Sequence, residues 1–182
     1  MLSIQTSFLK HFLSIQHEFM EVTAERDRVD VALKGRDMFV IIENKVNGAG
    51  EQKSQVYRYV HEIGMTKYGF ELEQIYVIYL NPTNRNLPSV YSLCDENGEK
   101  NVFEEIGKYH YKVQSYKYDI LKWLKGLSID NEPHISSALD QYIDFLENKF
   151  QFPLAIFTNE KIENFVISSV LGLFSRKFLE NF

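Results

Sequence analysis

Two carboxylates and a lysine stand close together in the first third of the chain. Asp30 is followed thirteen positions later by Glu43, and Lys45 comes two positions after Glu43. Carboxylate oxygens are ligands that Mg²⁺ prefers, and one or two suffice because this ion keeps several waters. A bound metal activates water and offsets charge on a phosphate, while a nearby lysine orients that water or offsets charge in the transition state. These residue types suit metal-assisted cleavage of a phosphodiester bond, but taken alone a Glu-Asn-Lys at a strand end is more often a solvated rim than a catalytic centre.

A β-hairpin is predicted to bring the two carboxylates together. Two β-rich runs, 28–33 and 38–42, flank the polar tetrad 34–37, which contains a glycine. This pattern predicts an antiparallel hairpin. With the turn at the middle of the tetrad, Asp30 lies opposite residues 41–43.

Glu43 and Lys45 follow the second of these strands. Side chains alternate between the faces of a strand, so Glu43 and Lys45 point the same way. The preceding run, 40–42, is apolar throughout, which is typical of a strand buried on both faces. Because burying polar groups is costly, such a strand must reach solvent or form a polar site at its end. The pattern alone leaves both outcomes open: a solvated rim, or a metal site with its own lysine.

A helix and a further strand are predicted after the hairpin. Apolar residues recur at helical spacing over 56–63, and Gln55 and Tyr59 share one face of this amphipathic helix because they are four positions apart. Residues 74–80 form another apolar strand, which Asn81 and Pro82 end. The order of strands and helix places the carboxylates inside an α/β domain.

The motifs together resemble the PD-(D/E)xK nuclease superfamily, in particular a branch with three short signatures. These are Arg-hydrophobic-Asp, Ile-Ile-Glu-Asn-Lys and Gln-x-x-x-Tyr, found here at 28–30, 41–45 and 55–59. Supporting similarity runs from about Phe8 to the mid-140s. The resemblance implies an α/β, restriction-endonuclease-like core in which helices flank a small mixed central β-sheet, with extra C-terminal helices.

The resemblance also implies a role for each site residue. Asp30 and Glu43 are expected to bind Mg²⁺, with Mn²⁺ as a substitute, helped by the backbone carbonyl of Asn44. Lys45 is the implied catalytic lysine, and Gln55 is an accessory residue near the site.

Two further residues are assigned from the same comparison. Residues 20–24 are predicted to form a strand that pairs with 29–33 through a short polar turn. Similar proteins often carry an acid in this segment, so Glu21 is a candidate third metal ligand, with a solvated strand residue as the equal alternative. Tyr59 is expected to be structural.

The charge of the chain is unusual for an enzyme acting on nucleic acid. The net charge is -5, whereas binding to a phosphate backbone depends largely on cationic side chains. Residues 108–125 are an exception, because they hold five lysines against the single acid Asp119, interleaved with aromatic residues. These aromatics either stack on bases or form the buried face of a helix whose lysines make a positive rim; the apolar spacing from Tyr116 to Leu127 favours the second interpretation.

The length and composition predict one packed domain over residues 1–182. The chain is 45% apolar and 14% aromatic, which suits a substantial core. We expect the nuclease-like core over about 8–126 and a helical extension over about 130–182. Apolar residues recur at helical spacing over 135–146 and 162–173, and these helices either cover the sheet or form a homodimer interface.

The setting is expected to be cytoplasmic and away from membranes. Cys94 is the single cysteine, so an internal disulfide is excluded and a reducing compartment is favoured. No signal-peptide pattern occurs, and the longest apolar run, 165–174, is too short to span a bilayer.

Other chemistries find no support in the sequence. The five histidines are dispersed, and none pairs at the spacing of a helical zinc site. No phosphate-binding Gly-Lys-Ser/Thr sequence and no Gly-x-Ser-x-Gly elbow occurs. Two functions remain: a Mg²⁺-dependent DNA endonuclease of a defence or repair system, or a non-catalytic binding or assembly module that keeps the nuclease fold. The intact Asp, Glu and Lys set favours the first, and the acidic composition favours the second.

Overall fold

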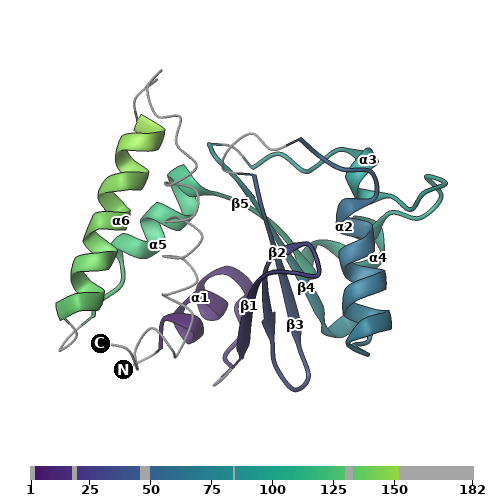
Figure 1. Cartoon of the computed structure of the whole chain (residues 1–182), viewed down its shortest axis with the longest axis horizontal. Coiled ribbons are helices and arrows are strands. Elements are labelled where there is room, and N and C mark those ends of the chain that lie inside the picture. Colours follow the sequence, from purple (N-terminus) through teal and green to yellow (C-terminus); the bar gives the residue numbers. More distant parts are fainter. Residues whose placement is uncertain (1–2, 18–19, 46–49, 84, 130–132, 152–182) are drawn as a thin grey trace.

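The computed structural model describes residues 3–17, 20–45, 50–83, 85–129 and 133–151. A five-stranded sheet lies at its centre, with helices on both faces (Figure 1). The elements follow the chain in this order: α1 (Ile4–Leu13), β1 (Glu21–Arg26), β2 (Val29–Lys34), β3 (Phe39–Asn44), α2 (Gln55–Arg58), η1 (Tyr59–Lys67), η2 (Leu72–Gln74), β4 (Ile75–Asn81), α3 (Val90–Leu93), α4 (Val102–His110), β5 (Tyr111–Ser115), η3 (Tyr116–Ile120), α5 (Leu121–Lys125) and α6 (Pro133–Gln151).

The sheet is mixed, with strand order β1-β2-β3-β4-β5. β1, β2 and β3 pair antiparallel, whereas β3, β4 and β5 pair parallel. The carboxyl ends of β3, β4 and β5 therefore meet at one edge of the sheet, which we call the carboxyl edge. The prediction of a restriction-endonuclease-like α/β core is confirmed.

The β2–β3 hairpin has the predicted register. Lys34 lies opposite Phe39, and the Gly35 N–H donates to the Met38 carbonyl at 2.8 Å, which closes the turn. At the other end of the hairpin Val31 pairs with Ile42, so the next residues out, Asp30 and Glu43, are neighbours. The turn sequence thus sets which side chain meets Glu43, because shifting the register by one residue would move every side chain to the other face.

Both faces of the sheet are covered by apolar side chains. Val40 and Ile42 belong to a core cluster that includes α1, α5 and α6, whereas Phe39 and Ile41 belong to a second cluster beneath α2 and η1. Figure 1 shows these two groups of helices on opposite sides of the strands. Burial on both sides explains why β3 is apolar without alternation.

The predicted helix that carries Gln55 is present and changes type along its length. It begins at Gln55, after Ser54 in a left-handed conformation (φ 52°). Beyond Arg58 it continues as a wider π-helical segment, η1. Gly64 permits this segment to approach the sheet, because a Cβ there would lie 2.7 Å from Ile75 Cδ1.

β5 was not predicted. Residues 108–125 form one basic, aromatic segment in the sequence, but Tyr111–Ser115 form the fifth strand and the chain is helical again from Tyr116 onward. Gly107, at φ 68°, interrupts the helix before this strand and lets the chain turn back along β4. The buried helical face predicted from Tyr116 is confirmed, since Tyr116 and Leu124 belong to the core.

The C-terminal part of the described chain is α6. Its residues Leu139, Tyr142 and Leu146 are buried in the same cluster as α5, so this helix packs within the chain. The second predicted C-terminal helix, over 162–173, lies outside the described residues. Within the described part of the chain, helices with the length and apolarity needed to cross a bilayer do not occur.

Candidate active site

Asp30 is held at the carboxyl edge by the backbone of the neighbouring strand. The Asn44 N–H donates to Asp30 Oδ2 at 2.7 Å. A peptide N–H bonded to a carboxylate fixes the direction of that side chain and stabilises its charged form. β3 therefore fixes the orientation of the Asp30 carboxyl group, including that of its second oxygen.

Glu43 and Lys45 form a buried ion pair beside Asp30. Lys45 Nζ lies 2.7 Å from Glu43 Oε1, and the two side chains are only 8% and 2% exposed, respectively. Both point to the face that α2 covers, as strand alternation predicts. A buried pair of this kind costs desolvation energy and adds little stability by itself. Its presence at the end of a strand is thus better explained by a chemical role than by stability.

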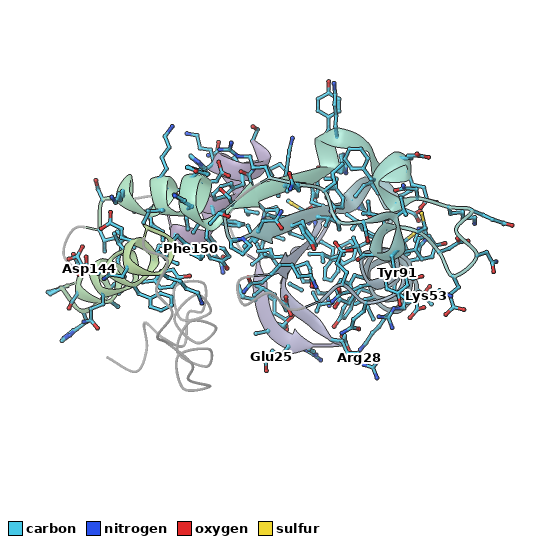
Figure 2. The ribbon with its side chains drawn as sticks, turned by 90° about the horizontal axis from the view of Figure 1, so that it is seen from above. Glu25, Arg28, Lys53, Tyr91, Asp144 and Phe150 are labelled. Atoms are coloured by element: carbon cyan, nitrogen blue, oxygen red, sulfur yellow. The ribbon has the colours of Figure 1, made fainter. Side chains whose placement is uncertain are left out.

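Gln55 and Tyr59 connect the lysine to the turn between β1 and β2. Lys45 Nζ donates to Gln55 Oε1 at 3.0 Å, and Gln55 Nε2 donates to the Tyr59 hydroxyl at 2.8 Å. That hydroxyl donates in turn to the Arg28 carbonyl at 2.5 Å. Arg28 has φ 65°, and Figure 2 shows it near Glu25 at this turn.

This chain of hydrogen bonds fixes the direction of the Gln55 amide. A tyrosine hydroxyl has one proton, and Tyr59 gives it to Arg28, so it can only accept from Gln55. Burial and then the charge of Glu43 raise the pKa of Tyr59 to about 12, so the hydroxyl keeps its proton. Gln55 consequently turns its NH₂ to Tyr59 and its oxygen to the ammonium of Lys45.

The electrostatics of the two carboxyl groups are coupled. Burial, followed by the charge of Asp30, raises the pKa of Glu43 to about 7, although Lys45 acts in the opposite direction. Burial also raises the pKa of Asp30, against the lowering effect of the Asn44 N–H. Two carboxyl groups in a poorly solvated position resist ionising together unless a cation joins them.

The carboxylate oxygens of Asp30 and Glu43 suit a hard divalent cation. Glu43 Oε2 is buried and, in the described structure, has no hydrogen-bond partner. No group of three or more metal-binding His, Cys, Asp or Glu side chains occurs among the described residues, so this site offers two carboxylates and no third. Asp30 and Glu43 would be the side-chain ligands, and two carboxylates are enough for an ion that keeps its own waters.

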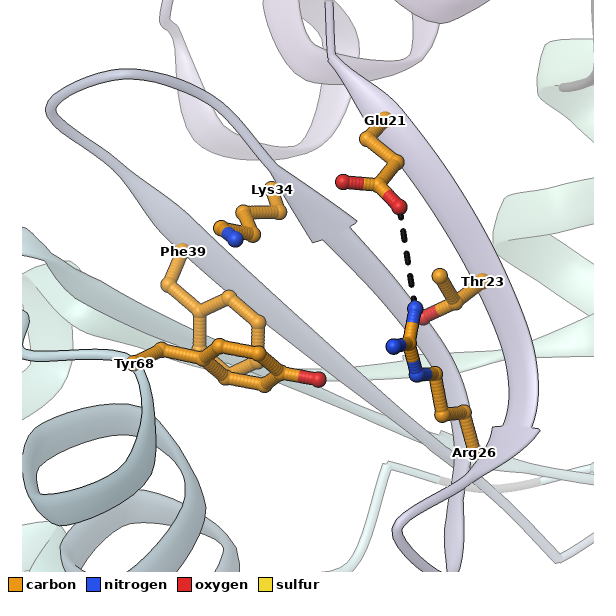
Figure 3. A pocket seen from close by; sticks show the side chains of 6 residues that line it. All are labelled: Glu21, Thr23, Arg26, Lys34, Phe39 and Tyr68. Atoms are coloured by element: carbon orange, nitrogen blue, oxygen red, sulfur yellow. Dashed lines mark ion pairs between the residues drawn. The ribbon is translucent and has the colours of Figure 1, made fainter.

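Glu21 is not brought to this group. It begins β1 and lies opposite Lys34, whereas Asp30 stands at the other end of β2. Lys34 and Asp30 are four residues apart along β2, at about 3.3 Å per residue. Figure 3 shows Glu21 paired with Arg26, at 3.8 Å, across a small pocket lined also by Thr23, Lys34, Phe39 and Tyr68. Glu21 is more than half exposed there, as the solvated alternative requires.

Glu51 takes a part that the sequence did not reveal. Its carboxylate accepts from the Ser89 N–H at 3.0 Å, from the Ser89 hydroxyl and from the Tyr79 hydroxyl at 3.3 Å. Tyr79 lies opposite Glu43 in the β3–β4 pair. Nearby, the Ser54 N–H donates to the Tyr91 carbonyl at 2.7 Å, and Figure 2 shows Tyr91 beside Lys53. Glu51 thus connects the segment before Gln55 to a loop thirty-eight residues away, a contact without a local sequence signal.

Replacing Tyr59 with Phe is expected to lower the free energy of unfolding by about 1–3 kcal/mol. The change leaves the buried Gln55 NH₂ and the partly buried Arg28 carbonyl without their shared partner. Urea unfolding measures the loss. Tyr57→Phe on the same helix is the control, because the Tyr57 ring stacks on His61 and this contact survives loss of the hydroxyl. Equal stability of the two variants would contradict the hydrogen-bond chain.

Comparison with protein families identifies the group to which the chain belongs. The PD-(D/E)XK nuclease superfamily matches residues 6–144, well over half of the 182 residues, and this range includes every residue of the site. Comparisons with curated proteins and with solved structures gave no match. The mixed sheet with flanking helices, and the acid, acid and lysine at its edge, agree with this assignment. The chain belongs to the PD-(D/E)XK nuclease superfamily.

Proposed function

We propose that the protein is a Mg²⁺-dependent phosphodiesterase that cleaves DNA internally, as an endonuclease of a defence or repair system. Membership of a nuclease superfamily supports action on nucleic acid. The observation that carries the proposal is the buried Glu43, which uses one carboxylate oxygen on Lys45 and leaves the other without a partner beside Asp30 in the described structure. Such an arrangement costs stability, and a cation would offset that cost.

Asp30, Glu43 and the backbone carbonyl of Asn44 are the proposed metal ligands. The N–H and C=O of one strand residue point toward the same neighbouring strand. Since the Asn44 N–H reaches Asp30, its carbonyl faces the same side. The ligand set is then all oxygen, which suits Mg²⁺ or Mn²⁺. When bound, such an ion lowers the pKa of a coordinated water and neutralises charge on the phosphate.

Lys45 is proposed to position the water that attacks phosphorus. In the hydrolysis, the water oxygen bonds to phosphorus while the bond to the leaving sugar oxygen breaks; one proton passes to solvent and the leaving oxygen gains one. Glu43 and Gln55 both accept from the ammonium of Lys45, so its direction is fixed. A fixed ammonium stabilises the charge that builds on the phosphate oxygens.

Nuclease assays with plasmid, linear duplex and single-stranded DNA and with RNA test the proposal. Cleavage of circular DNA with Mg²⁺ or Mn²⁺, lost on chelation and in Asp30→Asn, is expected. Asn keeps the size of Asp and an oxygen for the Asn44 N–H, but it removes the charge that a cation needs.

Metal binding separates this proposal from a non-catalytic module. Thermal unfolding is expected to shift upward with Mg²⁺ in the wild type and to stay unchanged in Asp30→Asn. A folded wild type that shows neither a metal-dependent shift nor cleavage would contradict the enzyme and favour a binding module, which the net charge of -5 would suit.

A further inference from the structure

An exposed aromatic residue with two cations stands near the candidate site. The Tyr118 side chain is 51% exposed. The Arg85 guanidinium carbon and Lys117 Nζ lie 5.9 and 5.5 Å from the centre of its ring. We call Arg85, Lys117 and Tyr118 the Tyr118 cluster. Both distances are near the outer limit of cation–π contact, and about half of the Tyr118 residue surface still meets solvent.

Asp119 holds the cluster in place. Its carboxylate accepts from Arg85 Nε at 2.8 Å and Nη2 at 2.6 Å, and it also accepts from the Ser115 N–H at 2.8 Å. These bonds lower the pKa of Asp119 against the effect of burial. The Arg85 side chain nevertheless remains 56% exposed. The cluster therefore presents a guanidinium of fixed direction to solvent.

The cluster and the candidate site share the carboxyl edge of the sheet. Lys45 N–H donates to the Leu80 carbonyl at 2.9 Å, at the end of β4, and Lys117 N–H donates to the Pro82 carbonyl at 3.1 Å. Lys45 and Lys117 are thus hydrogen-bonded to residues only two positions apart, at the end of β4 and just after it. Two strand spacings of about 4.8 Å separate β3 from β5, so the carboxyl ends of these two strands lie roughly 10 Å apart.

We propose that the Tyr118 cluster binds an unpaired stretch of the nucleic acid strand whose phosphate lies at Glu43 and Lys45. An aromatic face stacks on any base, and cations beside it contact the flanking phosphates. Stacking needs an exposed base face, which a single strand or a frayed end provides and an intact duplex does not. The inference rests on the proposed function and names the substrate form that the site prefers.

The chain contains a matched pair at the opposite edge of the sheet. Tyr109 is 73% exposed, and Lys108 Nζ lies 5.4 Å from its ring centre. This pair precedes β5, whereas Tyr118 follows it, so the length of the strand separates them. The tyrosine and lysine are the same in both pairs, whereas the position differs and Tyr118 has Arg85 in addition. Comparing the two pairs therefore tests location rather than the mere presence of tyrosine and lysine.

Fluorescence anisotropy with labelled oligonucleotides of about 16 nucleotides, the upper end of common single-strand site sizes, tests the inference. Single-stranded DNA, RNA of the same sequence and the DNA duplex are compared with Ca²⁺ in place of Mg²⁺. Tyr118→Ala is expected to weaken binding of the single strand by roughly 5- to 150-fold, while Tyr118→Phe binds as the wild type does. Lys117→Ala is expected to reduce the salt dependence of log K by about 0.7. Tyr109→Ala and Lys108→Ala are expected to change neither quantity.

The outcomes separate this inference from the proposed function. If the wild type cleaves DNA but Tyr118→Ala binds the single strand as tightly as the wild type does, the binding role of the Tyr118 cluster alone is overturned. The same holds if Tyr109→Ala weakens this binding as much as Tyr118→Ala does. Preference for the duplex over the single strand overturns it as well. Absence of both binding and cleavage in the wild type overturns the function and the inference together. The thermal midpoint of each variant shows that the fold is intact, since both tyrosines are exposed.

Discussion

Replacing Lys45 with Met is expected to lower the rate of DNA cleavage by about 10³-fold. The change removes the ammonium group that contacts both Glu43 and Gln55 and that would stabilise charge on the phosphate. Methionine keeps most of the volume of lysine, so the buried space that the Lys45 side chain occupies stays filled. Without Lys45 the Glu43 carboxylate would be a buried charge without its ion-pair partner. Glu43, whose pKa is already about 7, takes up a proton instead, so the variant is expected to fold. Single-turnover cleavage with Mg²⁺ measures the effect on the chemical step.

Lys53→Met is the matched control. Lys53 belongs to the segment just before the helix, is exposed and carries the same charge. The control variant should cleave at close to the wild-type rate and unfold at the same temperature. A similar loss in both variants would assign the effect to general charge reduction, and retained cleavage in Lys45→Met would remove lysine from the mechanism.

The second large effect concerns the stability of the metal-free protein, which is expected to fall by about 3 kcal/mol between pH 4.5 and pH 8. The pKa of Glu43 is about 7 in the folded protein and 4.5 in its ordinary environment. Between these values the folded state binds more protons than the unfolded state, so stability decreases as pH rises and levels off above pH 7. The raised pKa of Asp30 acts in the same direction.

Urea unfolding in chelator across this pH range measures the slope. Asp30→Asn is the informative variant, because it removes the charge that helps to raise the pKa of Glu43. The variant should show a shallower slope and higher stability at pH 8, while losing cleavage. Metal binding should show the opposite trend in the wild type: affinity for Mg²⁺ weakens about tenfold for each pH unit below 7, because Glu43 must lose its proton to bind. A stability curve that rises from pH 5 to 8 would contradict the buried position of Glu43.

The two strands that hold the site were predictable because their information is local. A strand repeats every two residues and a short turn fixes its register, so the segment from Asp30 to Lys45 contains what is needed to pair the carboxylates. Gln55 and Tyr59 share a helix face for an equally local reason, their spacing of four. The structure adds that this face turns toward Lys45.

Other features depend on contacts between distant segments. Tyr59 reaches the Arg28 carbonyl thirty-one residues away, and Glu51 reaches Ser89 thirty-eight residues away. β5 escaped prediction because five residues with aromatic and basic neighbours suit a strand or a helix equally until β4 supplies its hydrogen bonds. Glu21 was a candidate by sequence position, but the antiparallel register of β1 directs it to Lys34.

The sequence by itself determined the types and spacing of the reactive groups, the hairpin that pairs Asp30 with Glu43, and the helix face that carries Gln55. Only the tertiary structure decided that Glu43 and Lys45 are buried, that the Gln55 amide has one direction, and that Tyr109 and Tyr118 lie beyond opposite ends of β5. The physical reason is that hydrogen-bonding periodicity acts within a few residues, whereas desolvation and proton affinity depend on everything packed around a group.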